Sequence, residues 1–223
     1  MKKYLFMRAV LTFVGEGRLF TVVLASVLRI LAVLLILGAL VAWLQLWKLV
    51  FDSHGTAILG GVLFQGFFVI GVYMVVHTLW IRAADIQVAH APEFTVVPIV
   101  SVLLKMLGEI YACISLTVGV GGGIAAPFGS GYLGYQITKT IRSIPGFGLP
   151  QSLLQELLPR GGGGFLSVIL LPVGGAIAAL FSLFLFYTAS EMLVAVVDIA
   201  RNTRVLRGVA ERFTPSERNN QGQ

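Results

Sequence analysis

Four long apolar blocks constrain this chain more than any other feature. A helix needs roughly 20 apolar residues to cross a hydrocarbon layer of about 30 Å, and each block is long enough to do so. In lipid, backbone polar groups must be satisfied within a helix or a closed barrel, and the strict alternation of barrel strands is absent. We therefore predict an all-α integral membrane protein with four transmembrane helices at about 29–51, 56–81, 96–126 and 165–197.

The composition agrees with a multi-pass membrane protein. Hydrophobic residues make up 57% of the chain and charged residues 12%, whereas soluble domains carry about a quarter charged residues. The single cysteine, Cys113, excludes an intrachain disulfide framework and a cysteine-based metal site. The net charge of +6 is not gathered into a basic patch with interleaved aromatics. We therefore expect anionic lipid, and no nucleic acid, as a partner.

The basic residues predict the orientation of the chain. They cluster before the first block, after the second and after the fourth, which favours both termini on the cytoplasmic side of a cell inner (plasma) membrane. We expect an N-terminal amphipathic interfacial segment over 1–28, a transmembrane domain over 29–200 and a basic cytoplasmic tail over 201–223. At the start of the tail, three arginines recur at every third position, and we expect them at the lipid surface: Arg201, Arg204 and Arg207.

Glycine is abundant in two settings. A predicted outer loop over 127–164 has glycine-rich ends, and we interpret it either as a flexible, partly re-entrant connection or as a docking surface for a partner protein. A G-x-G-x-x-A match begins at Gly121, but no strand precedes it, so a dinucleotide site is not expected. Inside the blocks, small residues predict close helix packing at Gly60, Gly61, Gly66, Gly71, Gly174 and Gly175.

Catalytic and cofactor motifs are missing from the sequence. It contains no G-x-S-x-G nucleophile elbow and no H-E-x-x-H zinc motif. Only His77 lies inside a block, so one chain cannot supply two axial imidazoles to a haem, although copies could share one through His77. We expect His77 to be an interfacial or bundle-facing polar residue, and we expect no enzyme activity, cofactor or metal.

Apart from Arg29 and Lys48 near the ends of the first span, three charged residues lie inside the predicted spans, namely Lys105, Glu109 and Glu191. A charge at the bilayer centre is costly, so each should face the bundle or a polar cavity. Lys105 and Glu109 are four residues apart and share a helix face. Counting along the blocks places all three, with His77, in the cytoplasmic half. We expect an intramembrane polar cluster that serves either helix or subunit packing or an ion path.

The fourth block ends in a segment with a family-like pattern, SEMLVAVVDIARNTR, followed by VLRG. This segment resembles the closing span of small uncharacterised bacterial inner-membrane proteins. The resemblance implies a bacterial source and brings no activity with it.

These observations predict a non-catalytic membrane subunit, scaffold or assembly factor of a larger complex. Its expected partners are anionic lipids and other membrane subunits, including copies of itself. The alternative is a small ion or proton channel or transporter that uses the Lys105, Glu109 and Glu191 cluster. The outer halves of the blocks carry no carboxylate, which favours the first interpretation.

Overall fold

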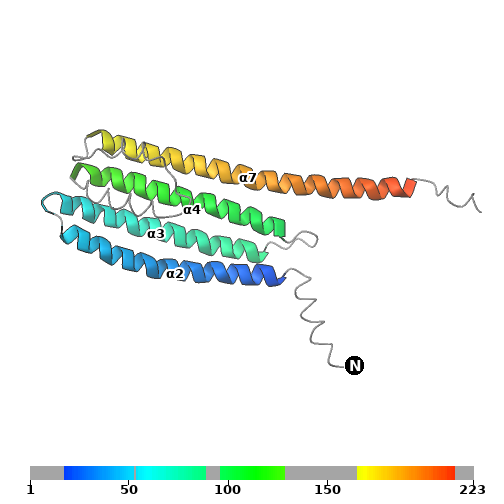
Figure 1. Cartoon of the computed structure of the whole chain (residues 1–223), viewed down its shortest axis with the longest axis horizontal. Helices are drawn as coiled ribbons and strands as arrows, with labels where there is room; N and C mark the ends of the chain where they lie inside the picture. The colour runs from blue at the N-terminus through cyan, green and yellow to red at the C-terminus, as the bar shows by residue number, and fades with distance from the viewer. Residues whose placement is uncertain (1–17, 53, 89–95, 129–164, 214–223) are drawn as a thin grey trace, which may run out of the picture.

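The structure is a computed structural model that describes residues 18–52, 54–88, 96–128 and 165–213. These residues form four long helices and contain no strand, so the predicted all-helical architecture is confirmed for them. The helices run side by side in Figure 1. They are α2 (Arg18–Phe51), α3 (Ala57–Val88), α4 (Val96–Ala125) and α7 (Phe165–Phe213), with a short 3₁₀ turn, η2 (Ala126–Phe128), after α4.

All four helices are long and apolar enough to cross a membrane, which indicates a multi-pass membrane protein. They contain 34, 32, 30 and 49 residues in chain order. At a rise of 1.5 Å per residue, they measure about 45 to 73 Å, well over the hydrocarbon thickness of about 30 Å. An average tilt of about 20° removes little of this excess. In such a bilayer, part of each helix would therefore extend beyond the hydrocarbon layer.

The helices also extend beyond the apolar blocks read from the sequence. α2 begins at Arg18 rather than near Arg29, α3 continues to Val88, and α7 continues to Phe213. A charged residue ends an apolar run without ending a helix, because arginine is a good helix former. Positions 1–17 of the predicted interfacial segment and positions 129–164 of the predicted outer loop lie outside the described residues.

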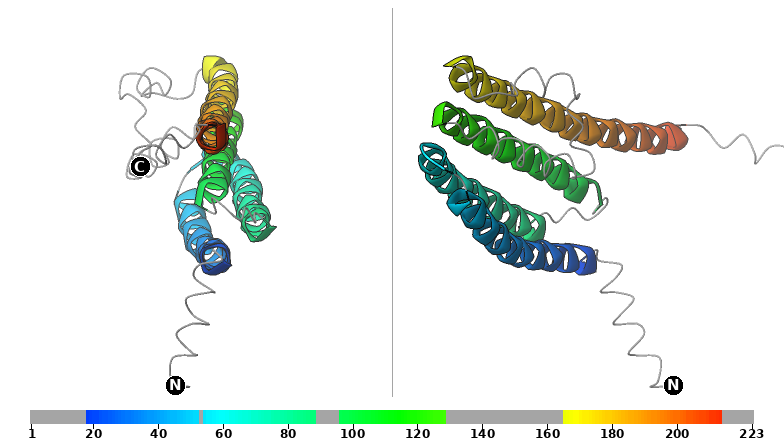
Figure 2. Two further views of the ribbon diagram at one scale, coloured as in Figure 1. Left: turned by 90° about the vertical axis from the view of Figure 1, so that its right-hand side faces the viewer. Right: turned by 60° about the vertical axis from the view of Figure 1, so that its left-hand side comes forward.

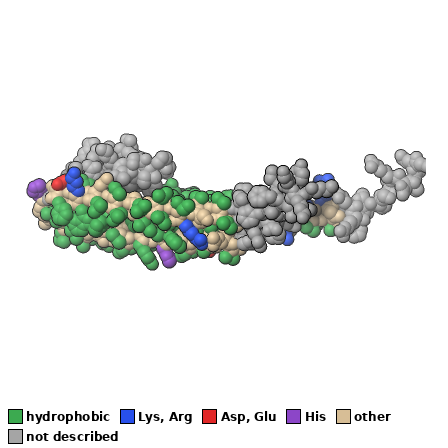
Figure 3. Space-filling view, turned by 90° about the horizontal axis from the view of Figure 1, so that it is seen from below, with side chains coloured by type: hydrophobic (Ala, Val, Ile, Leu, Met, Phe, Trp, Pro, Cys, Tyr) green, Lys and Arg blue, Asp and Glu red, His purple; other side chains and the backbone are tan. Residues whose placement is uncertain are grey.

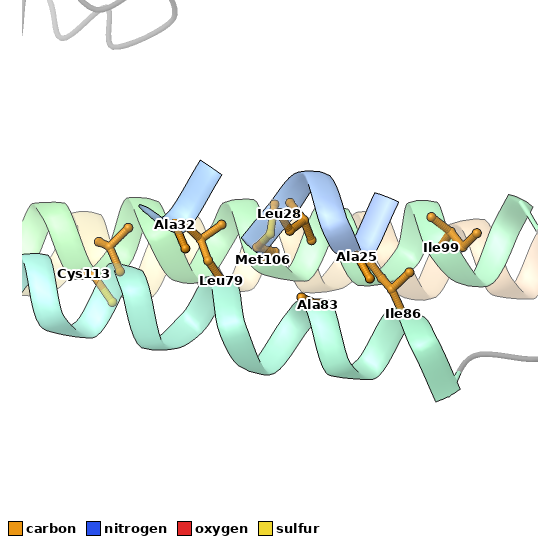
Figure 4. Close-up of a cluster of buried hydrophobic side chains, with 10 residues drawn as sticks. Ala25, Leu28, Ala32, Leu79, Ala83, Ile86, Ile99, Met106 and Cys113 are labelled. Atoms are coloured by element: carbon orange, nitrogen blue, oxygen red, sulfur yellow. The ribbon is translucent and has the colours of Figure 1, made fainter. Parts of the chain in front are cut away.

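Three helices pack around a shared apolar core, and α7 packs along α4 (Figure 2). The core lies where α2 and α4 meet α3, and Figure 4 shows its side chains pointing toward one another. It is formed by Ala25, Leu28, Ala32, Val75, Leu79, Ala83, Ile86, Ile99, Met106 and Cys113. Two of the three core residues on α2 are alanines, Ala25 and Ala32, and their small side chains let α2 approach α3 closely.

The outward faces of the bundle are apolar. On α2, for example, Ile30 is 59% exposed and Leu34 is 57% exposed. Hydrophobic side chains also cover much of the face seen in Figure 3. In water such a surface would favour aggregation, whereas hydrocarbon solvates it. The exposed apolar surface thus agrees with the span lengths.

Close helix contacts depend on glycines. A Cβ atom on Gly119 of α4 would lie 2.8 Å from the Gly175 Cα atom of α7, and one on Gly71 of α3 would lie 2.3 Å from the Thr117 hydroxyl of α4. Gly60 and Gly61 are also buried. By contrast, a Cβ atom on Gly66 or Gly174 would meet nothing within 4 Å.

Candidate functional site

Four charged side chains and one tyrosine on α3, α4 and α7 gather into one group, which we call the charged cluster and define as Arg82, Asp85, Lys105, Glu109 and Tyr187. α3 supplies Arg82 and, about one turn later, Asp85, whereas α4 supplies Lys105 and Glu109 at a spacing of four. α7 contributes Tyr187. Residues three or four apart on a helix share a face, so α3 and α4 each present two of these groups together.

The centre of the cluster is a two-pronged ion pair between α3 and α4. The Nε atom of Arg82 donates to Oε2 of Glu109 at 2.9 Å, and Nη2 of Arg82 donates to Oε1 of Glu109. The Arg82 side chain is 18% exposed and the Glu109 side chain 21% exposed. Such forked pairs are geometrically specific and are stronger than bonds between neutral groups.

The remaining members enclose this pair. The Tyr187 hydroxyl donates to Oε1 of Glu109 at 2.6 Å and lies 3.2 Å from Nη2 of Arg82. On the other side, Nη1 of Arg82 donates to Oδ2 of Asp85 at 2.8 Å. The Lys105 ammonium lies 5.4 Å from the centroid of the Tyr187 ring, within the range of a cation–π contact.

Two further polar contacts lie toward the same end of the bundle. Ser101 of α4 and Ser190 of α7 are buried and their hydroxyl oxygens are 2.6 Å apart. Nη2 of Arg29 on α2 donates to Oε1 of Gln87 on α3 at 3.0 Å. Hydrogen bonds between side chains thus join all four described helices at the end of the bundle that holds the charged cluster.

In chemical terms, the cluster is a compensated network. Arg82 and Lys105 carry two positive charges, and Asp85 and Glu109 carry two negative charges, which leaves no net charge. Both carboxylate oxygens of Glu109 already accept hydrogen bonds. The arrangement fixes the positions of three helices and contains no serine or cysteine nucleophile held against a base.

The sequence-predicted polar residues occupy different environments. The structure brings Lys105 and Glu109 into one network with Arg82 and Tyr187. Glu191, in contrast, is exposed on α7 beside the buried Ser190. His77 is exposed on α3, where its ring stacks on Tyr73 with a centroid distance of 5.6 Å.

Two members of the network were not identified as site residues from the sequence. Arg82 follows the second apolar block directly, so the sequence groups it with the basic residues that predict the orientation. Its spacing of three from Asp85 was the available signal, since an arginine that far inside a helix should have an acidic neighbour. Tyr187 gave no signal beyond its residue type, because its partners come from other helices.

The other predicted groups lie apart from the cluster. Arg201, Arg204 and Arg207 are exposed on the last turns of α7. Within the described ranges, no group of three or more His, Cys, Asp and Glu side chains could hold a metal ion. Cys113 is buried in the core.

The chain was compared with protein families, curated proteins and solved structures. No family model matches the chain, and neither the curated proteins nor the solved structures provide a match. The functional argument therefore depends on the geometry of the chain itself.

Proposed function

We propose that the protein is a non-catalytic membrane subunit, scaffold or assembly factor of a larger complex. The observation that carries this proposal is the compensated charged cluster. Arg82, Glu109 and Tyr187 use their polar atoms to join α3, α4 and α7, rather than to present a reactive or ligand-binding group. A component whose charged groups hold its own helices in place is suited to supporting other chains.

The position of the charges supports a membrane placement for this scaffold. In α2, the 18 residues from 30 to 47 carry no charge, and Arg29 and Lys48 bound them. At 1.5 Å per residue they cover about 27 Å, close to the thickness of the hydrocarbon layer. Trp43 and Trp47 lie near one boundary. Trp80, two residues before Arg82, lies near the other, as expected of aromatic belts.

This placement puts the charged cluster just inside the inner membrane interface, because Arg29, at the boundary, donates to Gln87, which lies five residues beyond Arg82 on α3. The ends of α2 and α7 that lie beyond Arg29 and Tyr187 then face the cytoplasm, with both chain termini on that side. We further propose that the membrane is a bacterial inner membrane. Arg201, Arg204 and Arg207 are exposed on α7 about 21 to 30 Å beyond Tyr187, on the cytoplasmic side of this membrane, where basic residues are enriched.

The geometry gives less support to the channel alternative. A proton carrier needs a carboxylate that is free to exchange its proton with a path, whereas Glu109 is held by Arg82 and Tyr187. Glu191 lies exposed on α7, outside this network. Proton flux into liposomes separates the two functions. Flux with the wild-type protein that Glu109→Gln abolishes without unfolding would contradict the scaffold proposal.

The direct test is native purification in a mild detergent. Tagged wild-type protein should co-purify from its own membranes with a fixed set of membrane subunits at a constant ratio. Gly119→Leu, which would separate α4 from α7, should reduce that recovery, whereas Gly174→Leu should not, because its position is open. Wild-type protein that purifies without any partner chain would contradict the proposal.

A further inference from the structure

The last part of α7 has no neighbouring described helix. Ser190 contacts Ser101, and α4 begins only five residues before Ser101, at Val96. An antiparallel neighbour therefore ends opposite about residue 195 of α7, whereas α7 continues to Phe213. Figures 1 and 2 show this helix projecting past α2, α3 and α4. Most helical stability in proteins comes from the packing of an amphipathic face against a neighbour.

A mainly apolar stripe follows one side of this helix. Its positions alternate in steps of four and three, and every one is exposed: Leu185, Ala189, Met192, Val196, Ile199, Thr203 and Leu206. Met192 is 67% exposed and Leu206 is 69% exposed. The average repeat of 3.5 residues over three heptads is the spacing of a coiled-coil seam.

We infer that this stripe pairs with the same stripe of a second copy, forming a parallel two-stranded coiled coil at the inner face of the membrane. Two copies inserted in one bilayer with the same orientation send α7 to the same side, so their helices can pair only in parallel. α7 lies at the edge of the bundle, along α4, and its stripe is not covered by α4. The pairing therefore needs no rearrangement of the fold.

At three of the four core positions from 196 to 206 the residue types are those that favour two strands, the exception being Ile199. Parallel dimers favour β-branched residues at the first core position and leucine at the second. Here Val196 and Thr203 take the first position, and Ile199 and Leu206 take the second. Arg201 and Arg204 lie away from the stripe by helical geometry, so pairing does not force their charges together. The inference deepens the scaffold proposal by naming a second copy as a partner.

Disulfide trapping in native membranes tests the pairing. Single cysteines are introduced into a Cys113→Ala background at Ile199 or Leu206 on the stripe, and at Val205 as the matched control. Val205 is 60% exposed and adjacent to Leu206, but it lies on another side of the helix. Mild oxidation should produce several-fold more covalent dimer from Ile199→Cys and Leu206→Cys than from Val205→Cys.

Mass measurement in detergent provides a second readout. The wild-type protein should be dimeric, Ile199→Asp should make it monomeric, and Val205→Asp should leave it dimeric. Equal trapping at all three cysteines, or a wild-type monomer, would overturn the inference, as would trapping of a different protein at Ile199→Cys. Co-purification and flux decide the scaffold function independently, so a scaffold without this coiled coil would be recognised as such.

Discussion

At the scale of single residues, Glu109 is the group on which the cluster depends. It is the one carboxylate of the cluster whose bonds reach two other helices, through Arg82 on α3 and Tyr187 on α7. Removing one partner of a poorly solvated ion pair leaves the other partner's charge uncompensated. Ion pairs of this kind also restrict which packings are possible, and we offer that specificity as the role of this one.

Glu109→Gln should destabilise the protein, because it removes the negative charge that compensates Arg82. Since both side chains retain some exposure, we expect a loss of about 1 to 3 kcal/mol in the free energy of unfolding. Equilibrium unfolding in detergent would measure it. Glu191→Gln is the control, because Glu191 is exposed, and its stability should match that of the wild type.

Tyr187→Phe isolates the contribution of one hydroxyl. The substitution keeps the ring beside Lys105 and removes the bond of 2.6 Å to Glu109. A hydrogen bond to a charged group contributes about 1.5 to 3 kcal/mol, so a loss near the lower end is expected in thermal or chemical unfolding. Tyr73→Phe alters an exposed tyrosine and should have no effect. Equal stability of both variants would remove Tyr187 from the network.

At the scale of helices, the contact between α4 and α7 depends on paired small residues. A Cβ atom on Gly119 would lie 2.7 Å from the Leu171 carbonyl oxygen, so even alanine requires the two helices to move apart. We expect Gly119→Ala to lower the free energy of unfolding by about 1 to 3 kcal/mol, as overpacking commonly does.

Gly174→Ala is the matched control for this contact, because its Cβ atom would meet nothing within 4 Å. Replacing glycine by alanine inside a helix favours folding by about 0.5 to 1 kcal/mol, so this variant should be unchanged or slightly more stable. If both substitutions destabilise equally in the same unfolding assay, the close approach of α4 and α7 is incorrect.

Helix type was predictable from sequence, whereas helix ends and partners were not. Apolar content located the four spans because hydrocarbon admits little else. It placed the start of the first block near Arg29 although α2 begins at Arg18, since helix propensity and solvation in lipid are separate properties. The distinction between Gly175 at a contact and Gly174 at an open position depends on the rotation of α7 about its axis, which composition does not encode.

At the scale of the whole molecule, sequence placed Lys105 and Glu109 on one face but did not identify what they meet. The spacing along one helix follows from the helical repeat, whereas the approach of Arg82 and Tyr187 depends on how three helices are arranged. Glu191 and Glu109 were indistinguishable as buried charges by depth alone. Only the packing of α7 exposes the first and encloses the second.

The proposed orientation predicts the side from which each end of the bundle can be labelled. In a Cys113→Ala background, Asn202→Cys should react with a membrane-impermeant maleimide only after the cells are opened. His54→Cys, in the turn before α3, should react in intact cells. The reverse pattern would place the charged cluster at the outer interface and overturn the assigned topology.

The most direct test of the central claim, that the charged cluster holds the helices together, is a double-mutant cycle between Arg82 and Glu109. The free energy of unfolding is measured for the wild type, Arg82→Gln, Glu109→Gln and the double variant. We predict that the double variant loses less than the sum of the single losses, with a coupling energy of about 1 kcal/mol or more. Additive losses would contradict the account, because they would mean that the two side chains stabilise the fold independently.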